Sequence, residues 1–258
     1  MSLPEAFTLD GKVALITGAG SGLGIEFAEA VAEAGSDVAC ADVNLSSAEQ
    51  TAARVEKHGR RALAIAVDVS DEKQVATMVA ETVATLGRLD VLFNNAGVAD
   101  ANPTPIHQMS SADWHQVIGV DLHGVFYCAR EALKVMVEQG SGKIVNVASM
   151  WGTAGSASII PMPGYTAAKG AVVNLTRELG LEYAPFGVQV NALCPGFYLT
   201  KLGAYDDPGF VAAITAFTPM GRIADPSEIR GPALFLASAA SDFMTGQILI
   251  VDGGCMAK

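Results

Sequence analysis

Cysteine and histidine are scarce in this chain, which has four of each among its 258 residues. Cys40, Cys128, Cys194 and Cys255 form no C-x-x-C pair, and no histidine accompanies them at the spacing of a metal site. Cys40 and Cys194 lie in strand-like runs, where a free cysteine is usually a small buried apolar residue. The sequence therefore predicts no metal site.

Positive charge is also in short supply. Only 16 Lys and Arg stand against 27 Asp and Glu, for a net charge of −11, whereas nucleic acids and anionic membranes are bound by clustered basic side chains. No apolar run approaches the length of a membrane span, and residues 1–7 lack the charged and apolar regions of a signal peptide. We expect no nucleic-acid partner, no membrane partner and a cytoplasmic location.

Apolar residues, in contrast, make up half of the chain, a composition typical of one compact globular protein. Strand-like runs alternate with helical patterns, and several runs, such as 62–67, are continuously apolar, as in a parallel sheet covered on both faces. The expected strands are 12–17, 37–42, 61–68, 89–94, 142–148, 188–194 and 247–251, and the expected helices are 22–34, 46–58, 71–86, 111–139, 165–184 and 226–238. The pattern predicts one α/β domain over residues 1–258, a Rossmann-type doubly wound parallel sheet of about seven strands with helices on both faces.

Two segments, 97–107 and 195–221, break this rhythm. Both follow the carboxyl ends of expected strands, where ligands of doubly wound folds bind. We therefore expect them to form walls of a substrate pocket, with the second as a candidate lid.

A glycine-rich turn follows the first expected strand. Residues 17–24 read TGAGSGLG, with Gly18, Gly22 and Gly24 in a G-x-x-x-G-x-G pattern, and a helical pattern begins directly afterwards. Such a turn lets backbone N–H groups and a helix N-terminus approach a pyrophosphate, because no Cβ blocks the approach. The second expected strand ends at Asp42, at about the distance expected for a ribose-binding carboxylate. The combination predicts a dinucleotide site.

A phenol and an ammonium group stand four residues apart in the run 165–169, on one face of an expected helix. A nearby cation favours the phenolate, so we expect Lys169 to bring the pKa of Tyr165 down towards neutrality, as suits a general acid/base. Ser149 ends the preceding strand at the ligand edge of the sheet, where its hydroxyl would hold a carbonyl oxygen for hydride attack. Taken in isolation, a Y-x-x-x-K pair is more often an exposed surface pair.

Together these motifs resemble the short-chain dehydrogenases/reductases of about 250 residues, and the resemblance covers nearly the whole chain. The glycine turn 17–24, the sequence NNAG at 94–97, Ser149, Tyr165, Lys169 and the Pro-Gly pair at 195–196 occur in the family's order. The resemblance implies that Tyr165 donates and accepts the proton. It also implies that Lys169 lowers the pKa of this tyrosine and binds the nicotinamide ribose, while Ser149 orients the substrate oxygen.

The resemblance also implies a cofactor site. Asn95 would support the sheet and approach the adenosine ribose, Asp68 and Val69 would contact adenine, and the segment 195–200 would seat the nicotinamide carboxamide. The expected cofactor-binding residues are Gly18, Ser21, Gly22, Leu23, Gly24, Asp42, Asp68, Val69, Asn95, Tyr165, Lys169, Pro195, Gly196, Phe197 and Thr200.

Asp42 also bears on the choice of cofactor. Its carboxylate would accept hydrogen bonds from both ribose hydroxyls and would repel a 2′-phosphate. Ser21 and Val43 occupy the positions at which relatives that bind this phosphate tend to carry a basic residue. We therefore expect NAD(H) to be preferred over NADP(H).

One position departs from the family pattern. The family's fourth catalytic residue is an asparagine in V-N-L-x-G, whereas residues 120–124 read VDLHG and place Asp121 there. Asp121 would keep the main-chain role of that asparagine, and its charge near Lys169 would partly offset the pull of the lysine on Tyr165. We expect retained activity with a shifted pH optimum, so Asp121 counts among the catalytic residues.

The substrate is less defined by the sequence. The segment 150–164 is a few residues longer than usual for the family and, with 197–199, offers apolar surface for a cyclic or partly apolar secondary alcohol or ketone, although the same residues would equally pack a loop or a subunit interface. A sugar acid or polyol stays open, with Lys201 as the one basic residue in these loops that would clamp a carboxylate. The expected substrate residues are Ser149, Met150, Trp151, Tyr165 and Tyr198.

These expectations describe an NAD(H)-dependent oxidoreductase that interconverts a secondary alcohol and a ketone. A non-catalytic NAD(H)-binding regulatory protein, disabled by Asp121, is the alternative from another class. A lyase or epimerase is less favoured, because such relatives usually carry an extra substrate domain. The resemblance further implies a homotetramer, or a homodimer, built on the long helices 111–139 and 165–184.

Overall fold

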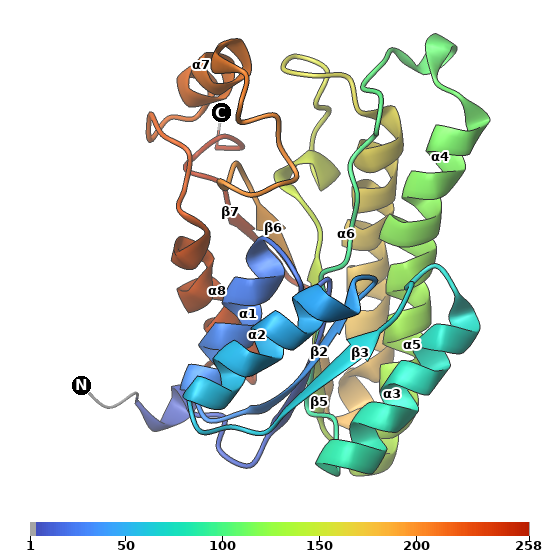
Figure 1. Cartoon of the computed structure of the whole chain (residues 1–258), viewed down its shortest axis with the longest axis vertical. Coiled ribbons are helices and arrows are strands. Elements are labelled where there is room, and N and C mark those ends of the chain that lie inside the picture. Colours follow the sequence, from blue (N-terminus) through green and yellow to red (C-terminus); the bar gives the residue numbers. More distant parts are fainter. Residues whose placement is uncertain (1–3, 258) are drawn as a thin grey trace.

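In the computed structural model, which describes residues 4–257, seven parallel strands form one sheet in the order β3-β2-β1-β4-β5-β6-β7 (Figure 1). The strands are β1 (Val13–Thr17), β2 (Asp37–Asp42), β3 (Ala62–Ala66), β4 (Val91–Asn94), β5 (Gly142–Val147), β6 (Val188–Pro195) and β7 (Ile248–Val251). Each matches an expected strand to within a few residues. The doubly wound Rossmann-type sheet predicted from the sequence is therefore confirmed.

Helices cover both faces of the sheet (Figure 1). One layer contains α1 (Leu23–Glu33), α2 (Leu45–Lys57) and α8 (Arg230–Ala237), and the other contains α3 (Glu72–Leu86), α5 (Val125–Gln139) and α6 (Pro163–Tyr183). The two main apolar clusters of the core lie between the sheet and these two layers. Because both faces are buried, the central strands are mostly apolar, and the buried Asn94, Asn146 and Asn191 among them are hydrogen-bonded.

Two regions differ from the expected pattern. The expected helix 111–139 is divided into α4 (Ser111–Ile118) and α5 by a π-helical turn, Gly119–Gly124, which begins and ends with glycine. Glycine stabilises an α-helix poorly, and π-helical turns are frequent at functional sites. The excursion 195–221 contains a short helix, α7 (Pro208–Phe217), which lies above the ends of β6 and β7 in Figure 1.

The strand order reverses between β1 and β4, which are neighbours in the sheet although β2 and β3 separate them along the chain. Ligands of doubly wound folds bind outside the carboxyl ends of the strands at such a switch point. The glycine-rich turn and the segment after β4 both leave the sheet there. Within residues 4–257, no helix combines the length and the apolar character that crossing a membrane requires.

Candidate active site

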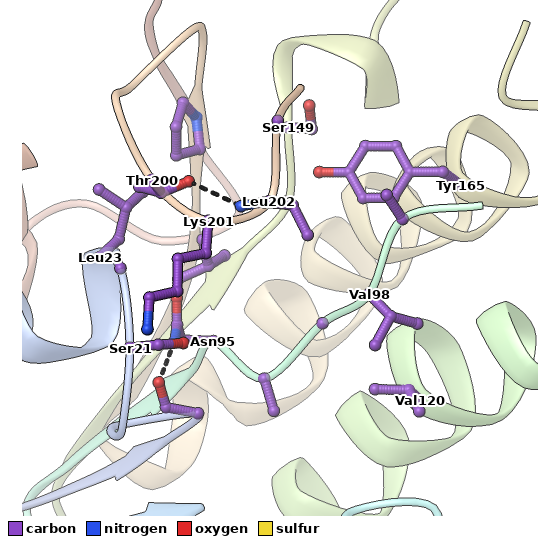
Figure 2. Close-up of a pocket in the computed structure, with 18 of the residues that line it drawn as sticks. Ser21, Leu23, Asn95, Val98, Val120, Ser149, Tyr165, Thr200, Lys201 and Leu202 are labelled. Atoms are coloured by element: carbon purple, nitrogen blue, oxygen red, sulfur yellow. Dashed lines mark hydrogen bonds between the residues drawn. The ribbon is translucent and has the colours of Figure 1, made fainter. Parts of the chain in front are cut away.

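A cavity of about 750 Å³ opens at the carboxyl ends of the strands (Figure 2). It reaches from Asp42 at the end of β2 to Tyr165 on α6. Its walls come from the glycine-rich turn, from residues 95–103, from the loop between β5 and α6, and from residues 195–210. The three expected loop regions, 97–107, 150–164 and 195–221, therefore meet around one cavity.

The glycine-rich turn is shaped by close backbone packing. Gly18 has a φ of 65°, and a Cβ there would lie 2.9 Å from the Cα of Ala96. A Cβ on Gly24 would overlap the carbonyl oxygen of Gly18. Gly24 is buried and does not line the cavity, so it allows the turn to close, whereas Gly18, Ser21, Gly22 and Leu23 line the wall.

Asn95 fixes this turn to the end of β4. Its side-chain amide donates to the carbonyl oxygen of Thr17 at 2.8 Å and to that of Gly18 at 3.3 Å. Its main-chain N–H donates to the hydroxyl of Thr17 at 3.0 Å. Asn95 also lines the cavity, so it combines the supporting position expected from the sequence with access to a ligand.

The carboxylate of Asp42 is oriented by two main-chain donors. Its Oδ2 accepts from the N–H of Gly20 at 2.9 Å, and its Oδ1 accepts from the N–H of Asn44 at 2.9 Å. A Cβ on Gly20 would lie 2.8 Å from the carboxyl carbon of Asp42. Gly20 is not among the residues expected from the sequence, because it occupies a variable position of the glycine pattern and its role appears only through this contact.

At the other end of the cavity, the hydroxyl of Tyr165 points toward Ser149 (Figure 2). Lys169 lies one helical turn further along α6, with its Nζ 5.5 Å from the centroid of the Tyr165 ring. The same Nζ donates to the carbonyl oxygen of Val147 at 3.1 Å. The structure thus brings the expected Ser, Tyr and Lys side chains together, and all three are buried.

Asp121 forms a buried ion pair with Lys169. Its Oδ2 lies 3.1 Å from the Nζ of the lysine, and its Oδ1 accepts from the N–H of Val98 at 2.8 Å. The π-helical turn places this carboxylate against α6, and it is fully buried. Gly97 makes room for the pair, because a Cβ there would lie 3.0 Å from Asp121 Oδ2 and 3.2 Å from Lys169 Nζ.

The surroundings of Tyr165 raise its pKa, contrary to the decrease expected from the sequence. Burial raises this pKa, and the charge of Asp121 raises it further, which together exceed the lowering effects of Lys169 and of the Ser149 hydroxyl. Burial alone would lower the pKa of Lys169, but the attraction of Asp121 outweighs burial and raises it. Lys169 therefore acts in the expected direction on Tyr165, while the net pKa lies above the ordinary tyrosine value and not towards neutrality.

Replacing Asp121 with Asn is expected to move the acidic limb of the kcat profile for alcohol oxidation to lower pH. The charge of Asp121 raises the pKa of Tyr165, so its removal lowers that pKa and the phenolate forms at lower pH. The amide that the variant introduces keeps an oxygen for the Val98 N–H. Glu49→Gln removes an exposed charge outside the cavity and serves as the control. An unchanged limb, or a shift to higher pH, would contradict this electrostatic role.

The remaining cofactor residues also line the cavity. Asp68 and Val69 follow β3, and the Asp68 carboxylate accepts from the N–H of Ser70 at 2.9 Å. Pro195, Gly196, Phe197 and Thr200 form the opposite wall. The hydroxyl of Thr200 accepts from the N–H of Leu202 at 3.3 Å, which shapes the beginning of the segment above the cavity (Figure 2).

Two of the expected substrate residues, Met150 and Tyr198, make contacts within the protein. Met150 is buried in an apolar cluster with Trp151 and Tyr165 and does not line the cavity, so the expected contact with substrate is wrong for this residue. Tyr198 contributes to the wall, but its hydroxyl donates to the carbonyl oxygen of Val251 at 3.4 Å. Trp151 does line the cavity, with its ring 6.1 Å from that of Phe197.

Two further residues of the cavity wall, Asp100 and Tyr205, were not expected from the sequence. The buried Asp100 places its Oδ2 3.5 Å from the backbone nitrogen of Tyr165 and so holds the first turn of α6. Tyr205, in the segment before α7, also lines the cavity. Neither belongs to a recognisable spacing pattern, and both become evident only when the loops are placed. Across residues 4–257, no cluster of three or more His, Cys, Asp or Glu side chains suitable for a metal ion occurs.

Known proteins are similar in sequence to this chain along nearly its whole length. A family model described as enoyl-(acyl carrier protein) reductase matches residues 18–256. The chain is 42% identical to cis-4-hydroxycyclohexanecarboxylate dehydrogenase of Sinomonas cyclohexanicum, across 94% of this chain and 96% of that protein. It is 38% identical to 2-dehydro-3-deoxy-D-gluconate 5-dehydrogenase of Dickeya dadantii, across 98% and 99%.

The fold is shared as well. The crystal structure of a gluconate 5-dehydrogenase from Burkholderia cenocepacia, in complex with NADP and tartrate, matches with a TM-score of 0.92 and 38% identity, across 98% of each chain. These similar proteins are dehydrogenases that act on CH–OH groups, and the solved one holds a nucleotide cofactor. The chain therefore belongs to the short-chain dehydrogenase/reductase family and is an oxidoreductase of CH–OH groups.

Proposed function

We propose that this protein interconverts a secondary alcohol and a ketone with a nicotinamide dinucleotide, and that it prefers NAD(H). The observation that carries the proposal is one continuous cavity with Asp42 at one end and the Ser149, Tyr165 and Lys169 cluster at the other. A dinucleotide has an adenosine ribose at one end and a reactive nicotinamide at the other. The two ends of the cavity suit these two parts.

The residues present fit such a cofactor. A side chain at Gly18 would collide with Ala96, and one at Gly20 would collide with Asp42. Because glycine occupies both positions, the turn can pack closely and its backbone can face a pyrophosphate at the N-terminus of α1. The carboxylate of Asp42 is held at the cavity wall, where ribose hydroxyls would donate to it. When bound, the nicotinamide supplies the hydride acceptor for oxidation or the hydride donor for reduction.

The side chains around Tyr165 supply proton transfer and orientation. In the oxidation, the Tyr165 phenolate would take the proton of the alcohol hydroxyl, and in the reduction the phenol would return a proton to the carbonyl oxygen. Ser149 would hold the same oxygen by a hydrogen bond. Lys169 stabilises the phenolate form, and the ion pair with Asp121 together with the Val147 carbonyl fixes the position of the lysine.

The preference for NAD(H) rests on Asp42. The solved relative from Burkholderia cenocepacia holds NADP, so membership of this family does not decide the cofactor. In this chain β2 ends with the carboxylate of Asp42. The two positions at which relatives that bind the 2′-phosphate tend to carry a basic residue hold Val43, which is 75% exposed, and Ser21, which lines the cavity. A carboxylate at this place would repel a 2′-phosphate.

Replacing Asp42 with Ala is expected to lower the ratio of kcat/KM for NAD⁺ to that for NADP⁺ by about 10-fold to 100-fold, because the ribose acceptor and the repulsive charge disappear together. Initial rates with each cofactor at fixed alcohol measure the ratio. Glu49→Gln, which removes an exposed acid on the helix that follows Asp42, controls for net charge. If the ratio stays unchanged in Asp42→Ala, the proposed NAD(H) preference does not come from this carboxylate.

Apolar side chains dominate the substrate end of the cavity, where Trp151, Ile160, Met162 and Phe197 form the wall. This surface favours a cyclic or partly apolar alcohol, the class to which the substrate named for the Sinomonas relative belongs. A sugar acid is the second candidate, because the Dickeya and Burkholderia relatives both carry gluconate-type names.

The proposed activity is tested by following nicotinamide absorbance with purified protein, NAD⁺ and a panel of cyclic alcohols, aryl carbinols, polyols, sugar acids and sterols. Turnover within one chemical class is the expected result. No turnover across the panel, with NADH binding verified by fluorescence, would refute the proposal and favour a regulatory NAD(H)-binding protein.

We also propose a cytoplasmic homotetramer. Phe126 on α5 and Leu181 on α6, on the long helices where the resemblance places the subunit interface, are 44% and 76% exposed. Association through these helices would cover them.

A further inference from the structure

The helix that carries Tyr165 and Lys169 has no capping side chain at its own N-terminus. α2, α3, α4 and α7 each follow a residue whose side chain accepts from a main-chain N–H of the first turn. The corresponding residue of α6 is Met162, whose side chain carries no oxygen, and the Pro163 that follows has no N–H. The first-turn N–H groups of Gly164 and Tyr165 therefore require an acceptor from another part of the chain.

Asp100, in the segment that follows β4, supplies this acceptor. Its Oδ2 lies 3.5 Å from the backbone nitrogen of Tyr165. Burial raises the pKa of the Asp100 carboxyl group, while hydrogen bonds from the N–H groups of Tyr165 and Gly164 partly offset this effect. A capping oxygen accepts from the second or third residue of a helix, which in α6 are Gly164 and Tyr165. Asp100 thus caps α6 from 65 residues away, with its negative charge at the positive end of the helix dipole.

Gly164 leaves the space that the carboxylate occupies. A Cβ on Gly164 would lie 2.6 Å from Asp100 Oδ1 and 2.9 Å from the terminal methyl carbon of Met109. Asp100 is 4% exposed, and Gly164 and Tyr165 are buried as well. Loss of the carboxylate would therefore leave main-chain donors unpaired in the interior, which costs stability and loosens the first turn of the helix.

The same segment also reaches the partner of Lys169. The N–H of Val98 donates to Asp121 Oδ1 at 2.8 Å, and Asp121 Oδ2 lies 3.1 Å from the Nζ of Lys169. Val98 lies between Tyr165 and the π-helical turn (Figure 2). Residues 98–100 therefore contact the backbone of Tyr165 at one end and, through Asp121, hold the ammonium group of Lys169 at the other.

We propose that Asp100 is a positioning residue for Tyr165, whose carboxylate fixes the first turn of α6 and thereby the place of the phenol hydroxyl opposite Ser149. The Cβ of a residue follows its backbone, so a displaced first turn moves this hydroxyl away from the substrate oxygen. Misplacement by about 1 Å can cost about 10²-fold in rate. The inference rests on the proposed function, because it concerns the proton transfer assigned there to Tyr165.

The first test compares two substitutions of Asp100. Asp100→Ala is expected to lower kcat for alcohol oxidation by about 10-fold to 100-fold, while KM for the alcohol and Kd for NADH change by less than about 3-fold. Asp100→Asn keeps an acceptor oxygen for the N–H groups, so its kcat should stay within about 3-fold of the wild-type value. A kcat as low in Asp100→Asn as in Asp100→Ala, or a loss that appears in KM or in NADH binding, would overturn the proposal.

Asp71→Ala is the matched control, because it also removes a carboxylate that caps a helix. Asp71 accepts from the N–H groups of Lys73 at 2.9 Å and Gln74 at 3.2 Å at the start of α3, outside the cavity wall. Both alanine variants should unfold at a lower temperature than the wild type, whereas only Asp100→Ala should lose kcat. A similar loss of kcat in Asp71→Ala would show that lost stability, and not the position of Tyr165, limits the rate.

Gly164→Ala tests the same contact without removing the carboxylate. Its methyl group displaces Asp100, so we expect kcat to fall by about 10-fold in the wild-type background and by less than about 3-fold in Asp100→Ala. Equal losses in both backgrounds would contradict the proposal, and this variant also decides the outcome if Asp100→Ala does not fold. Unchanged kcat in folded Asp100→Ala would overturn the role of Asp100 while the proposed oxidoreductase activity stands. No turnover of any alcohol by wild-type protein that binds NADH would overturn both.

Discussion

Replacing Tyr165 with Phe is expected to lower kcat by about 10³-fold while the protein still binds NADH. The substitution removes the hydroxyl that faces Ser149 in the cavity and keeps the ring that packs with Met150 and Trp151. Loss of a positioned general acid/base costs about 10² to 10⁴ in rate. Single-turnover rates and NADH fluorescence titrations on the same preparation separate the chemical step from binding.

Tyr183→Phe provides the control for loss of a tyrosine hydroxyl from α6, because Tyr183 is the last residue of this helix and lies outside the cavity wall. Its rate should match that of the wild type. If Tyr165→Phe retained more than about a tenth of the wild-type kcat, proton transfer would have to come from another group, and the proposed role of Tyr165 would be wrong.

Replacing Lys169 with Met is expected to reduce stability as well as activity. The side chain of Lys169 is 4% exposed and that of Asp121 is fully buried, so the variant leaves a carboxylate in the interior without its partner. Breaking a buried ion pair in this way typically costs about 3 to 5 kcal/mol. The free energy of unfolding in urea measures the loss, and kcat should fall because the phenolate of Tyr165 loses its nearest cation.

A second variant separates the two effects. The double substitution Lys169→Met with Asp121→Leu removes both charges, so most of the stability should return while the activity stays low. Lys134→Met is the surface control, because Lys134 is 64% exposed and pairs with Glu131 at 2.7 Å, where an ion pair contributes about 1 kcal/mol or less. Equal stability losses in Lys169→Met and Lys134→Met would contradict the burial argument.

The sequence predicted the parts of this protein that follow local rules. Continuous apolar runs predicted the buried parallel strands, because period and composition reflect burial on both faces. The turn at 17–24 was predictable because Gly18 and Gly22 adopt positive φ values, which residues other than glycine rarely adopt. The Ser149, Tyr165 and Lys169 cluster was predictable from spacing and from the family resemblance.

Features that depend on tertiary contacts were not predictable in this way. The role of Gly20 depends on the carboxylate of Asp42, which approaches it from the next strand. The net pKa of Tyr165 depends on how deeply it is buried and on Asp121, and neither quantity can be obtained from a Y-x-x-x-K spacing. Tyr205 comes to the cavity only because the segment before α7 folds over the strand ends.

The central claim, hydride transfer between a carbinol carbon and a nicotinamide, is tested most directly by isotope transfer. The protein is incubated with NAD⁺ and the best alcohol of the panel, carrying deuterium on the carbinol carbon, and the mass of the reduced nicotinamide is measured. We predict that each reduced cofactor carries one deuterium taken from the alcohol. Reduced cofactor without deuterium, or no reduction of NAD⁺ by any alcohol although NADH binds, would contradict the account.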